Sequence, residues 1–558
     1  MGFLKSPLRP VSTALALTAV LLAPLRAQEP PPFQLQVDHS AHGMVAAAHP
    51  LATWAGVRML EAGGNAADAA VAAAFAAAVV EPTMNSIGGR NQILIHLPDG
   101  SVRGIDATTQ APMTYDPETA PQAEYGYAVI GIPGAVAGLV RLQSEFGTLP
   151  LETVMDPAIR YAREGFAVLP GDAARQAAGA EQAAEFEGTR RYYLKPDGTP
   201  YQAGEILVQE DLARTLLIIA KTDGEAFYRG EIAELMAADL QAHGSAVTLE
   251  SLEDYRAEDA LIVRGSYRGY DLAGMYVPAA GAVAVEALHI LENFELADMD
   301  PAERIAHVGQ ALSLAFDDWD LQGEPEMASL ITSMEFAAER AEEIHLGSGV
   351  GVGQGPLDHL DGRHTAHLEG SHTTHLSTAD ASGMMVALTQ TLGPNMGSKV
   401  ATPGLGFLYA STLGGYLGDM QPGERARSFI CPFMLMKDGE PVLVLGAAGG
   451  SMIPVAVVNA VVHFVDGGLP FPEAVTAPRI APSGDAFRME THPGAGWNDH
   501  TVDQVRALGM EVQEVPRQAA FGRIHGIRFN TATRRWEGVA DPDWEGTALG
   551  AGKAGGAP

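Results

Sequence analysis

An alanine-rich stretch, residues 65–80, constrains the fold of this chain more than any other segment. It has the sequence NAADAAVAAAFAAAVV, and alanine has the highest intrinsic helix propensity of all residues. Gly63 and Gly64 precede it and Pro82 follows it, which are turn and stop signals for a helix. A helix with small apolar side chains on every face is typical of a protein interior. We therefore expect a central, buried helix in a large globular fold.

Composition agrees with a large globular protein. The chain has 558 residues, of which 47% are hydrophobic and 18% charged, and these values exclude disordered, collagen-like and coiled-coil proteins. The formal net charge of −33 argues against nucleic acid and anionic membrane surfaces as partners, since both attract basic proteins. The single cysteine, Cys431, excludes a disulfide framework and a cysteine-rich zinc site.

The N-terminus has the features of a secretory signal peptide. Lys5 and Arg9 form a positive start, residues 11–22 are apolar, and Ala27 supplies a small residue at a cleavage position. The apolar run is shorter than the ~20 residues that a membrane-spanning helix needs. We expect a signal peptide over residues 1–27, a periplasmic or extracellular mature protein, and no membrane attachment after its removal. A buried N-terminal helix is the alternative interpretation.

The sharpest change in composition lies before residue 373. Residues 347–355 are glycine-rich and residues 358–372 are polar and histidine-rich, which is typical of a connector. Residues 373–380 (TTHLSTAD) then predict a β-branched strand, and residues 384–391 (MMVALTQT) a second one. The turn residues between them indicate a hairpin.

A threonine at the start of a core strand, directly after such a connector, can serve as an N-terminal nucleophile. If the bond before Thr373 is cut, the new α-amine and the hydroxyl lie on the same residue. An amine with a pKa of ~7.7–8 can take the hydroxyl proton near neutral pH and activate a weak nucleophile. The Thr-Thr-His sequence alone is weak evidence, because most threonines in strands are only strand formers.

Motifs along most of the chain strengthen this interpretation, because their order resembles the γ-glutamyltranspeptidase family of N-terminal-nucleophile hydrolases. The matching segments are GGNAADAA (63–70), VVEP (79–82), IGG (87–89), GIPGAVAGL (131–139), FGTLP (146–150), PAI (157–159), GF (165–166), YRGY (267–270), PAAG (278–281), TTH (373–375), PG (403–404), GAAGGS (446–451), APR (477–479) and ADP (540–542). No single motif is decisive, but the shared order over most of the chain is specific.

The resemblance implies an α+β fold, a four-layer αββα sandwich that two autoprocessed subunits share. Autocatalytic cleavage between His372 and Thr373 would give a large subunit, 28–372, and a small subunit, 373–558, which together form one folded heterodimer. The family needs no cofactor or metal. Its substrates are small-molecule or peptide amides.

The same resemblance assigns catalytic roles. The nucleophile falls at Thr373, and a second threonine that supports it falls at Thr391. The oxyanion hole falls at Gly449 and Gly450, where a glycine turn lets backbone N–H groups approach a developing negative charge. Without the resemblance, these two glycines would be interpreted as an ordinary tight turn.

The expected substrate-binding site contains Thr108, Gly393, Gly415, Ser428 and Phe429, and all of these except Ser428 depart from the family pattern. Thr108 stands where an arginine binds the α-carboxylate of a γ-glutamyl group, and Gly393 replaces an asparagine. Gly415 stands near the place of an aspartate that pairs with the substrate amine, and Ser428-Phe429 replaces a serine pair. The changes predict a roomier, more apolar acyl pocket. We therefore expect the acyl donor to differ from a plain γ-glutamyl group.

Two further clusters have chemical and structural interpretations. His364, His367, His372 and His375 have a spacing that resembles metal ligands. However, cleavage after His372 would divide them between two chains, and we favour a polar connector without a metal. The acidic run at Asp317, Asp318 and Asp320 could hold Ca²⁺ or act in acid–base chemistry, but we interpret it as a solvated helix end.

Three functions therefore remain open from sequence. The first is an exported amidohydrolase or acyltransferase with Thr373 as nucleophile and a donor other than a plain γ-glutamyl group. The second is a true γ-glutamyltransferase or glutathione hydrolase that recognises its donor with different residues. The third is a non-catalytic secreted binding protein on the same fold.

Overall fold

The computed structural model describes Gly2 and residues 36–346, 372–414, 417, 420–484, 486–491, 495–516, 521–541 and 545–552. The expected signal peptide, except for Gly2, lies outside the described residues. Gly415 and residues 347–371 of the expected connector do so as well. The elements below all belong to one compact unit, Phe33–Pro558.

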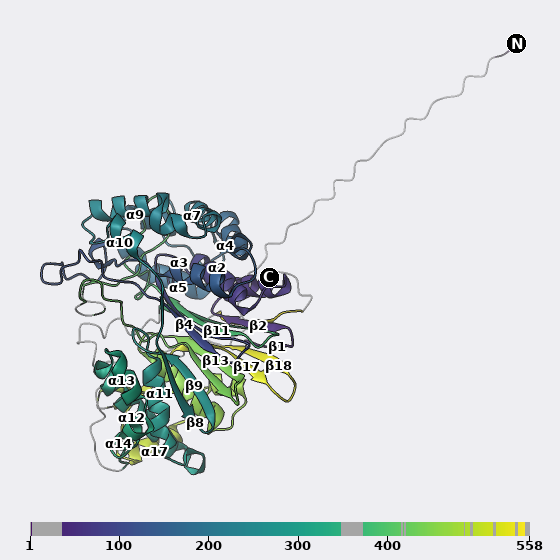
Figure 1. Ribbon diagram of the computed structural model, residues 1–558, viewed down its shortest axis with the longest axis vertical. Coiled ribbons are helices and arrows are strands. Elements are labelled where there is room, and N and C mark those ends of the chain that lie inside the picture. Colours follow the sequence, from purple (N-terminus) through teal and green to yellow (C-terminus); the bar gives the residue numbers. More distant parts are fainter. Residues whose placement is uncertain are drawn as a thin grey trace. The chain divides into compact units, whose positions relative to one another are not determined.

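Two antiparallel, seven-stranded sheets form the centre of this unit (Figure 1). The first sheet has the order β19 (Thr547–Gly550), β2 (Gly43–Ala47), β10 (Thr373–Asp380), β11 (Met385–Thr391), β3 (Arg90–His96), β4 (Val102–Ala107) and β7 (Glu258–Asp259). The second sheet has the order β1 (Gln36–Ser40), β18 (Arg535–Ala540), β17 (Arg523–Asn530), β13 (Glu440–Ala448), β12 (Phe433–Lys437), β9 (Tyr270–Met275) and β8 (Ile262–Tyr267). Each sheet contains strands from both sides of residues 347–371.

Helices cover the outer face of each sheet (Figure 1). The layer on the first sheet contains α1 (Pro50–Glu61), α2 (Ala66–Val80), α3 (Ala135–Phe146), α4 (Leu151–Glu164), α5 (Pro170–Ala183), α6 (Glu187–Tyr193), α7 (Glu210–Lys221), α8 (Glu225–Arg229), α9 (Glu231–Ala242) and α10 (Leu249–Asp254). The layer on the second sheet contains α11 (Gly281–Glu292), α12 (Pro301–Asp317), α13 (Pro325–Ile331), α14 (Met334–Ala341), α15 (Met452–Val465), α16 (Phe471–Thr476) and α17 (Asp499–Ala507). The predicted αββα sandwich is confirmed.

Smaller elements complete the described chain. A three-stranded sheet contains β14 (Ile480–Ser483), β15 (Ala486–Glu490) and β16 (Glu511–Val515), and a two-stranded sheet contains β5 (Phe166–Ala167) and β6 (Ile206–Leu207). The short 3₁₀ helices are η1 (Tyr127–Val129), η2 (Leu296–Asp298) and η3 (Asp318–Leu321).

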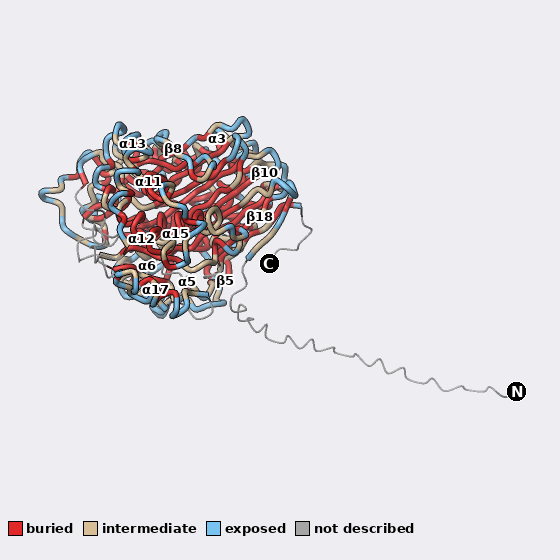
Figure 2. The backbone as a smooth tube through the Cα atoms, turned by 90° about the horizontal axis from the view of Figure 1, so that it is seen from below, coloured by how far each residue is buried: buried red, intermediate tan, exposed pale blue. Residues whose placement is uncertain are grey.

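Helix α2 is the central buried helix that the alanine-rich stretch predicts. Every residue from Ala66 to Val80 is buried. Figure 2 shows the buried parts of the backbone in red. The Asn65 side chain accepts hydrogen bonds from the backbone N–H groups of Ala67 and Asp68, and the Asp68 carboxylate accepts one from the Asn65 N–H at 2.7 Å. This capping box satisfies backbone donors at the start of the helix, where they have no intrahelical partner.

The two sheets pack against each other through a layer of apolar side chains. This layer includes Met44 and Leu94 from the first sheet and Met434, Val444 and Ile527 from the second, all buried. We call the face of the first sheet toward this layer its inner face. The opposite face, toward α1, α2 and α3, is its outer face.

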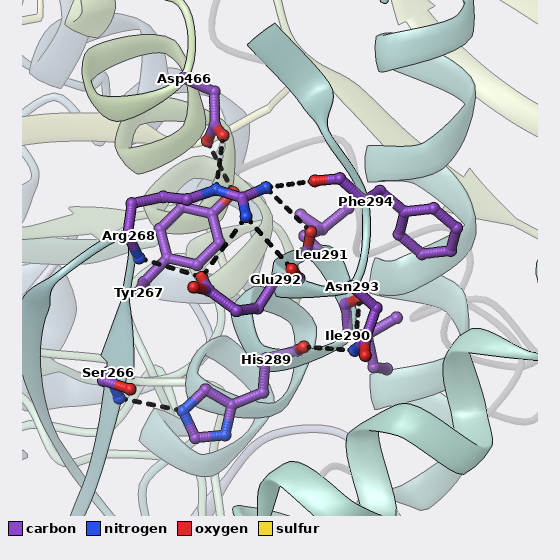
Figure 3. Close-up of polar contacts among 10 residues, drawn as sticks. All are labelled: Ser266, Tyr267, Arg268, His289, Ile290, Leu291, Glu292, Asn293, Phe294 and Asp466. Carbon is purple, nitrogen blue, oxygen red and sulfur yellow. Dashed lines mark hydrogen bonds and ion pairs between the residues drawn. The ribbon is translucent and has the colours of Figure 1, made fainter. Parts of the chain in front are cut away.

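The YRGY motif ties the turn between β8 and β9 to two helix ends (Figure 3). Arg268 adopts a left-handed conformation with φ 49°, and its guanidinium donates to the carbonyl oxygens of Leu291, Glu292 and Phe294 at the end of α11. It also pairs with Asp466 at 3.0 Å, beyond α15. A cation near exposed helix carbonyls is favourable, so this motif has a structural explanation.

Candidate active site

Thr373 and Thr391 lie side by side on neighbouring strands. Strand β10 begins at Thr373 and β11 ends at Thr391, and the antiparallel register places the two residues directly opposite each other. The Thr373 hydroxyl donates a 3.1 Å hydrogen bond to the Thr391 hydroxyl, and both residues are buried. The predicted hairpin is therefore present in the structure, and it brings the two threonine hydroxyls into contact.

The Thr391 hydroxyl also contacts the bond that is expected to be cut. It donates to the carbonyl oxygen of His372 at 2.8 Å and accepts from the backbone N–H of Gly393 at 2.9 Å. Thr391 thus connects the hydroxyl of Thr373 to the carbonyl group of the preceding peptide bond. A proton can pass along such a chain of hydroxyl groups as the carbonyl is attacked.

A second row of polar side chains supports the nucleophile's strand. On the inner face, His375 contacts the hydroxyls of Thr389 at 2.7 Å and Ser377 at 3.1 Å through its two ring nitrogens. The Ser377 hydroxyl in turn donates to the backbone carbonyl of His525 at 3.0 Å. Burial, together with the nearby His525, lowers the pKa of His375 well below its ordinary value. The ring is therefore neutral near pH 7 and joins β10 to β11, while Ser377 makes the hydrogen bond to the second sheet.

The two sheets approach closely at this histidine because the facing residue is a glycine. A Cβ atom on Gly446 of β13 would lie 2.4 Å from the His375 ring, which no side chain can occupy. Three residues later, Gly449 and Gly450 form the turn between β13 and α15. A Cβ atom on Gly449 would lie 2.7 Å from the Cα of Gly522, and Gly450 has φ 59°. Both positions therefore favour glycine, for different steric reasons.

The outer face of β10 carries a carboxyl group that sequence analysis did not single out. The Thr374 hydroxyl donates to Glu81 Oε2 at 2.8 Å, and Glu81 is only 3% exposed. Burial raises the pKa of Glu81 to about 7, although the charge of Arg175 and the hydrogen bond from Thr374 lower it. The period of two along a strand predicts that Thr374 points away from Thr373, but only the fold reveals which group it meets.

Comparison with known proteins assigns the chain to a family. Residues 52–551 match the family model of gamma-glutamyltranspeptidase. The chain belongs to the gamma-glutamyltranspeptidase family. It is 31% identical to the glutathione hydrolase proenzyme of Escherichia coli over 96% of this chain and 97% of that protein. It is also 31% identical to the acylase ACY 1 proenzyme of Pseudomonas sp. strain V22, over 88% and 90% of the two chains.

Solved structures give the same assignment. The cephalosporin acylase of Bacillus halodurans superposes with a TM-score of 0.84 at 30% identity, over 95% of this chain and 99% of that chain. The gamma-glutamyltranspeptidase of Helicobacter pylori superposes with a TM-score of 0.52 at 31% identity, over 53% and 90%. The fold is therefore that of the N-terminal-nucleophile hydrolases in this family. In the described part of the chain, no helix is both long and apolar enough to cross a membrane.

The positions that depart from the gamma-glutamyltranspeptidase pattern have different surroundings in the structure. Thr108 is 1% exposed, and its hydroxyl donates to the carbonyl oxygen of Ala426 at 2.9 Å. The backbone N–H of Gly393 donates to the Thr391 hydroxyl, and that of Ser428 donates to Pro278 O at 2.8 Å. Gly415 lies outside the described residues.

Phe429 belongs to an aromatic cluster beside the end of α12. Its ring lies 4.8 Å from that of Trp319 and 5.6 Å from that of Phe316, centroid to centroid. The Arg427 guanidinium lies over Trp319 at 4.6 Å. The ring at position 429 is therefore fixed by packing against its aromatic neighbours.

Of the histidine cluster and the acidic run noted in the sequence, the acidic run differs from the expectation. Asp318 is buried and forms an ion pair with Arg340 at 2.7 Å, so the prediction of a solvated acidic helix end is wrong at this residue. The helix does end there, because α12 stops at Asp317. His364 and His367 lie outside the described residues, whereas both ring nitrogens of His375 contact hydroxyl groups.

Proposed function

We propose that this chain is an autoprocessing amidohydrolase with Thr373 as its N-terminal nucleophile. The observation that carries the proposal is the position of the Thr391 hydroxyl, which contacts both Thr373 Oγ1 and the carbonyl oxygen of His372. Membership of the gamma-glutamyltranspeptidase family supports the same chemistry, as do relatives whose names describe them as proenzymes.

Maturation would begin with attack of Thr373 Oγ1 on the carbonyl carbon of His372. As the new C–O bond forms, the Thr373 hydroxyl proton passes to Thr391, and the proton of Thr391 passes to the carbonyl oxygen. The C–N bond then breaks as that proton moves to the Thr373 nitrogen, which gives an ester. Water hydrolyses the ester, releases His372 as a carboxylate and leaves Thr373 with a free α-amine and a free hydroxyl. The products would be the subunits 28–372 and 373–558.

Catalysis would reuse the same hydroxyl. The α-amine of Thr373 accepts the hydroxyl proton, and Oγ1 attacks the substrate amide to form an acyl-enzyme. The backbone N–H groups of Gly449 and Gly450 would stabilise the negative charge on the substrate oxygen. The proton is then given to the leaving amine, and water releases the acyl group. Thr391 would orient the nucleophile in both reactions.

We propose further that the acyl donor differs from a plain γ-glutamyl group. The hydroxyl of Thr108 is already bonded to Ala426, and a threonine cannot form the paired hydrogen bonds that an arginine forms with a carboxylate. Phe429 adds an apolar ring to the same set of positions. The similarity to acylases supports this proposal. The similarity to glutathione hydrolase proenzymes favours the second candidate, a true γ-glutamyltransferase.

A comparison of purified wild type with Thr373→Ala tests the function. Wild type should hydrolyse acyl-p-nitroanilides and the variant should not, while γ-glutamyl-p-nitroanilide should be a poor donor. A value of kcat/KM for glutathione at or above ~10⁴ M⁻¹s⁻¹, typical of good enzymes, would instead favour the γ-glutamyltransferase. If the chain stays uncut and hydrolyses none of the amides, a binding protein is favoured. The expected export is tested separately. The large chain is recovered from cell fractions, and its N-terminal sequence is determined.

A further inference from the structure

A cavity in the second helical layer lies apart from the candidate active site. It has a volume of about 200 Å³ and lies between α12, α15 and Trp497. We call it the α15 pocket, and its wall includes Arg304, Val308, Val462, His463, Ile480 and Trp497. Helix α15 begins at Met452, next to the turn with Gly449 and Gly450, and it rises about 1.5 Å per residue. His463 therefore lies about 16 Å along the helix from that turn.

The wall of the α15 pocket is mostly apolar and held in place. Val308, Val462 and Ile480 are each at most 4% exposed. The indole Nε1–H of Trp497 donates to the carbonyl oxygen of Arg479 at 3.2 Å. An indole ring that is fixed in this way offers a flat surface on which an aromatic ring can pack.

The volume of the pocket sets the size of its ligand. An apolar cavity of about 150 Å³ holds one benzene molecule, whereas drug-sized ligands occupy pockets of about 300–1,000 Å³. The α15 pocket, at about 200 Å³, therefore fits a single aromatic ring with short substituents.

His463 gives the pocket a hydrogen-bond acceptor. Its Nε2 lies 3.1 Å from the carbonyl oxygen of Pro478, and because a carbonyl oxygen only accepts, Nε2 carries the proton. Burial, together with the charges of Arg479 and Arg304, lowers the pKa of His463 to about 4, so the ring is neutral near pH 7. Nδ1 is then an acceptor, and no described residue donates to it.

Arg304 gives the pocket a positive charge. Its Nε and Nη2 donate to the carbonyl oxygens of Leu296 at 2.9 Å and Met299 at 3.4 Å, and its Nη1 has no partner among the described residues. No described carboxylate pairs with this guanidinium, although Asp and Glu outnumber Lys and Arg by 68 to 35 in the chain. A guanidinium that is anchored but has no carboxylate partner is suited to bind an anion.

The remaining polar side chain of the wall, Asn459, is fully used by the protein. Its amide nitrogen donates to the carbonyl oxygens of Val455 and Ile480, and its amide oxygen accepts from the backbone N–H of Ile480. The pocket therefore recognises a ligand through one cation and one neutral acceptor on an otherwise apolar wall. These two groups are complementary to a carboxylate and to a hydroxyl or amino donor.

We propose that the α15 pocket is a second binding site of this protein, for a monocyclic aromatic acid whose ring also carries a hydroxyl or amino group. The carboxylate binds Arg304, the hydroxyl or amino group donates to Nδ1 of His463, and the ring packs against Trp497 and the aliphatic wall. The site does not depend on the chemistry of Thr373, so the inference stands apart from the proposed function.

Calorimetric titration of the purified protein near pH 7 with hydroxybenzoates tests this proposal. The three positional isomers are compared with the hydroxybenzamides, which lack the charge, and with benzoate, which lacks the donor. At least one isomer should bind with one molecule per chain and a Kd in the micromolar to millimolar range, as expected for about ten non-hydrogen atoms. Its amide should bind about 10- to 100-fold more weakly, as for a lost charged hydrogen bond, and benzoate about 2- to 10-fold more weakly, as for a neutral one.

Variants of the two polar groups test their separate roles. Arg304→Gln should bring acid and amide to nearly equal affinity, and Arg304→Lys should keep part of the difference. His463→Phe should remove the advantage of the hydroxybenzoate over benzoate and keep the preference for acid over amide. Arg190→Gln is the matched control, because Arg190 also donates to a helix carbonyl, that of Ala184 at 3.0 Å, but in the other helical layer. It should leave both preferences unchanged.

Tryptophan fluorescence tests where the ligand binds. A ring that packs against Trp497 should change the emission of the wild type, and Trp497→Phe should lose most of this change while it still binds the ligand in calorimetry. Val308→Phe fills the pocket and should abolish binding. If this variant does not fold, the fluorescence of Trp497→Phe still decides.

Three results would overturn the inference. They are the absence of saturable binding of every isomer, equal affinities of acids and amides in the wild type, and an unchanged fluorescence response in Trp497→Phe. A chain that hydrolyses no amide but binds hydroxybenzoates with these preferences would contradict the proposed function and support the α15 pocket.

Discussion

The hydroxyl of Thr391 donates a 2.8 Å hydrogen bond to the carbonyl oxygen of His372. The same hydroxyl accepts a hydrogen bond from Thr373 at 3.1 Å. One side chain therefore contacts both groups that would react in the proposed maturation, the Thr373 hydroxyl and the His372 carbonyl. The relationship gives Thr391 a role in the proposed maturation as well as in catalysis.

Removal of this hydroxyl should slow maturation strongly. Thr391→Val keeps the shape of the side chain but can neither accept the Thr373 proton nor donate to the carbonyl oxygen. Loss of one donor to a developing oxyanion typically costs about 10²–10³ in rate, and we expect a decrease of that order. The rate of conversion of purified precursor to two chains on a denaturing gel measures it.

Thr391→Ser is the matched control, because it keeps the hydroxyl and removes only a methyl group. It should mature much faster than Thr391→Val. Equal rates for the two variants would mean that packing of the methyl group, not the hydroxyl, determines maturation.

The glycines of the turn after β13 should differ in their tolerance of substitution. At Gly449 an added Cβ atom would lie 2.7 Å from backbone, the Cα of Gly522, whereas at Gly450 no atom lies within 4 Å. Gly449→Ala should therefore reduce stability by about 1–3 kcal/mol, as overpacking does. Gly450→Asn should cost less, because asparagine tolerates the left-handed conformation. Urea unfolding measures both, and a larger loss for Gly450→Asn would contradict the observed packing.

Glu81 should make stability depend on pH. Its folded pKa of about 7 exceeds the ordinary value, so the folded protein holds a proton that the unfolded chain releases between about pH 4.5 and 7. The free energy of unfolding contributed by this group should therefore be fully present below about pH 4.5 and lost as the pH rises through about 7. A shift of this size corresponds to about 3 kcal/mol.

Glu81→Gln should flatten this part of the pH profile, since the amide does not titrate. The variant and wild type are compared by urea unfolding at about pH 5 and about pH 7.5. These two values lie on either side of most of the transition. Glu61→Gln, at an exposed position in α1, controls for loss of a surface carboxylate. An unchanged pH difference in Glu81→Gln would show that this carboxyl group ionises normally.

Local sequence signals predicted the parts of the fold that depend on neighbouring residues. The alanine-rich stretch indicated the buried helix α2 because propensity and its end signals agree over residues 65–80. The hairpin at Thr373 and Thr391 followed from two β-branched strands with a turn between them. The αββα sandwich itself came from the family resemblance, because alternating strands and helices indicate only a mixed class.

Contacts between distant segments could not be predicted in this way. Arg90 lies beside Thr391 only because β3 pairs with β11 in one register, and a shift of one residue would turn it to the other face. Likewise, the ion pair of Asp318 with Arg340 depends on how α14 packs near η3, so the charges alone suggested a solvated run. Gly415 lies outside the described residues, and its proposed place near the substrate amine stays a prediction.

The N-terminal sequence of the smaller chain is the most direct test of Thr373 as nucleophile. Purified wild type should separate into two chains on a denaturing gel, and Edman degradation of the smaller one should read Thr-Thr-His-Leu-Ser. Thr373→Ala should remain a single chain under the same conditions. A wild type that stays uncut and hydrolyses amides, or a small chain that begins at another residue, would contradict the account.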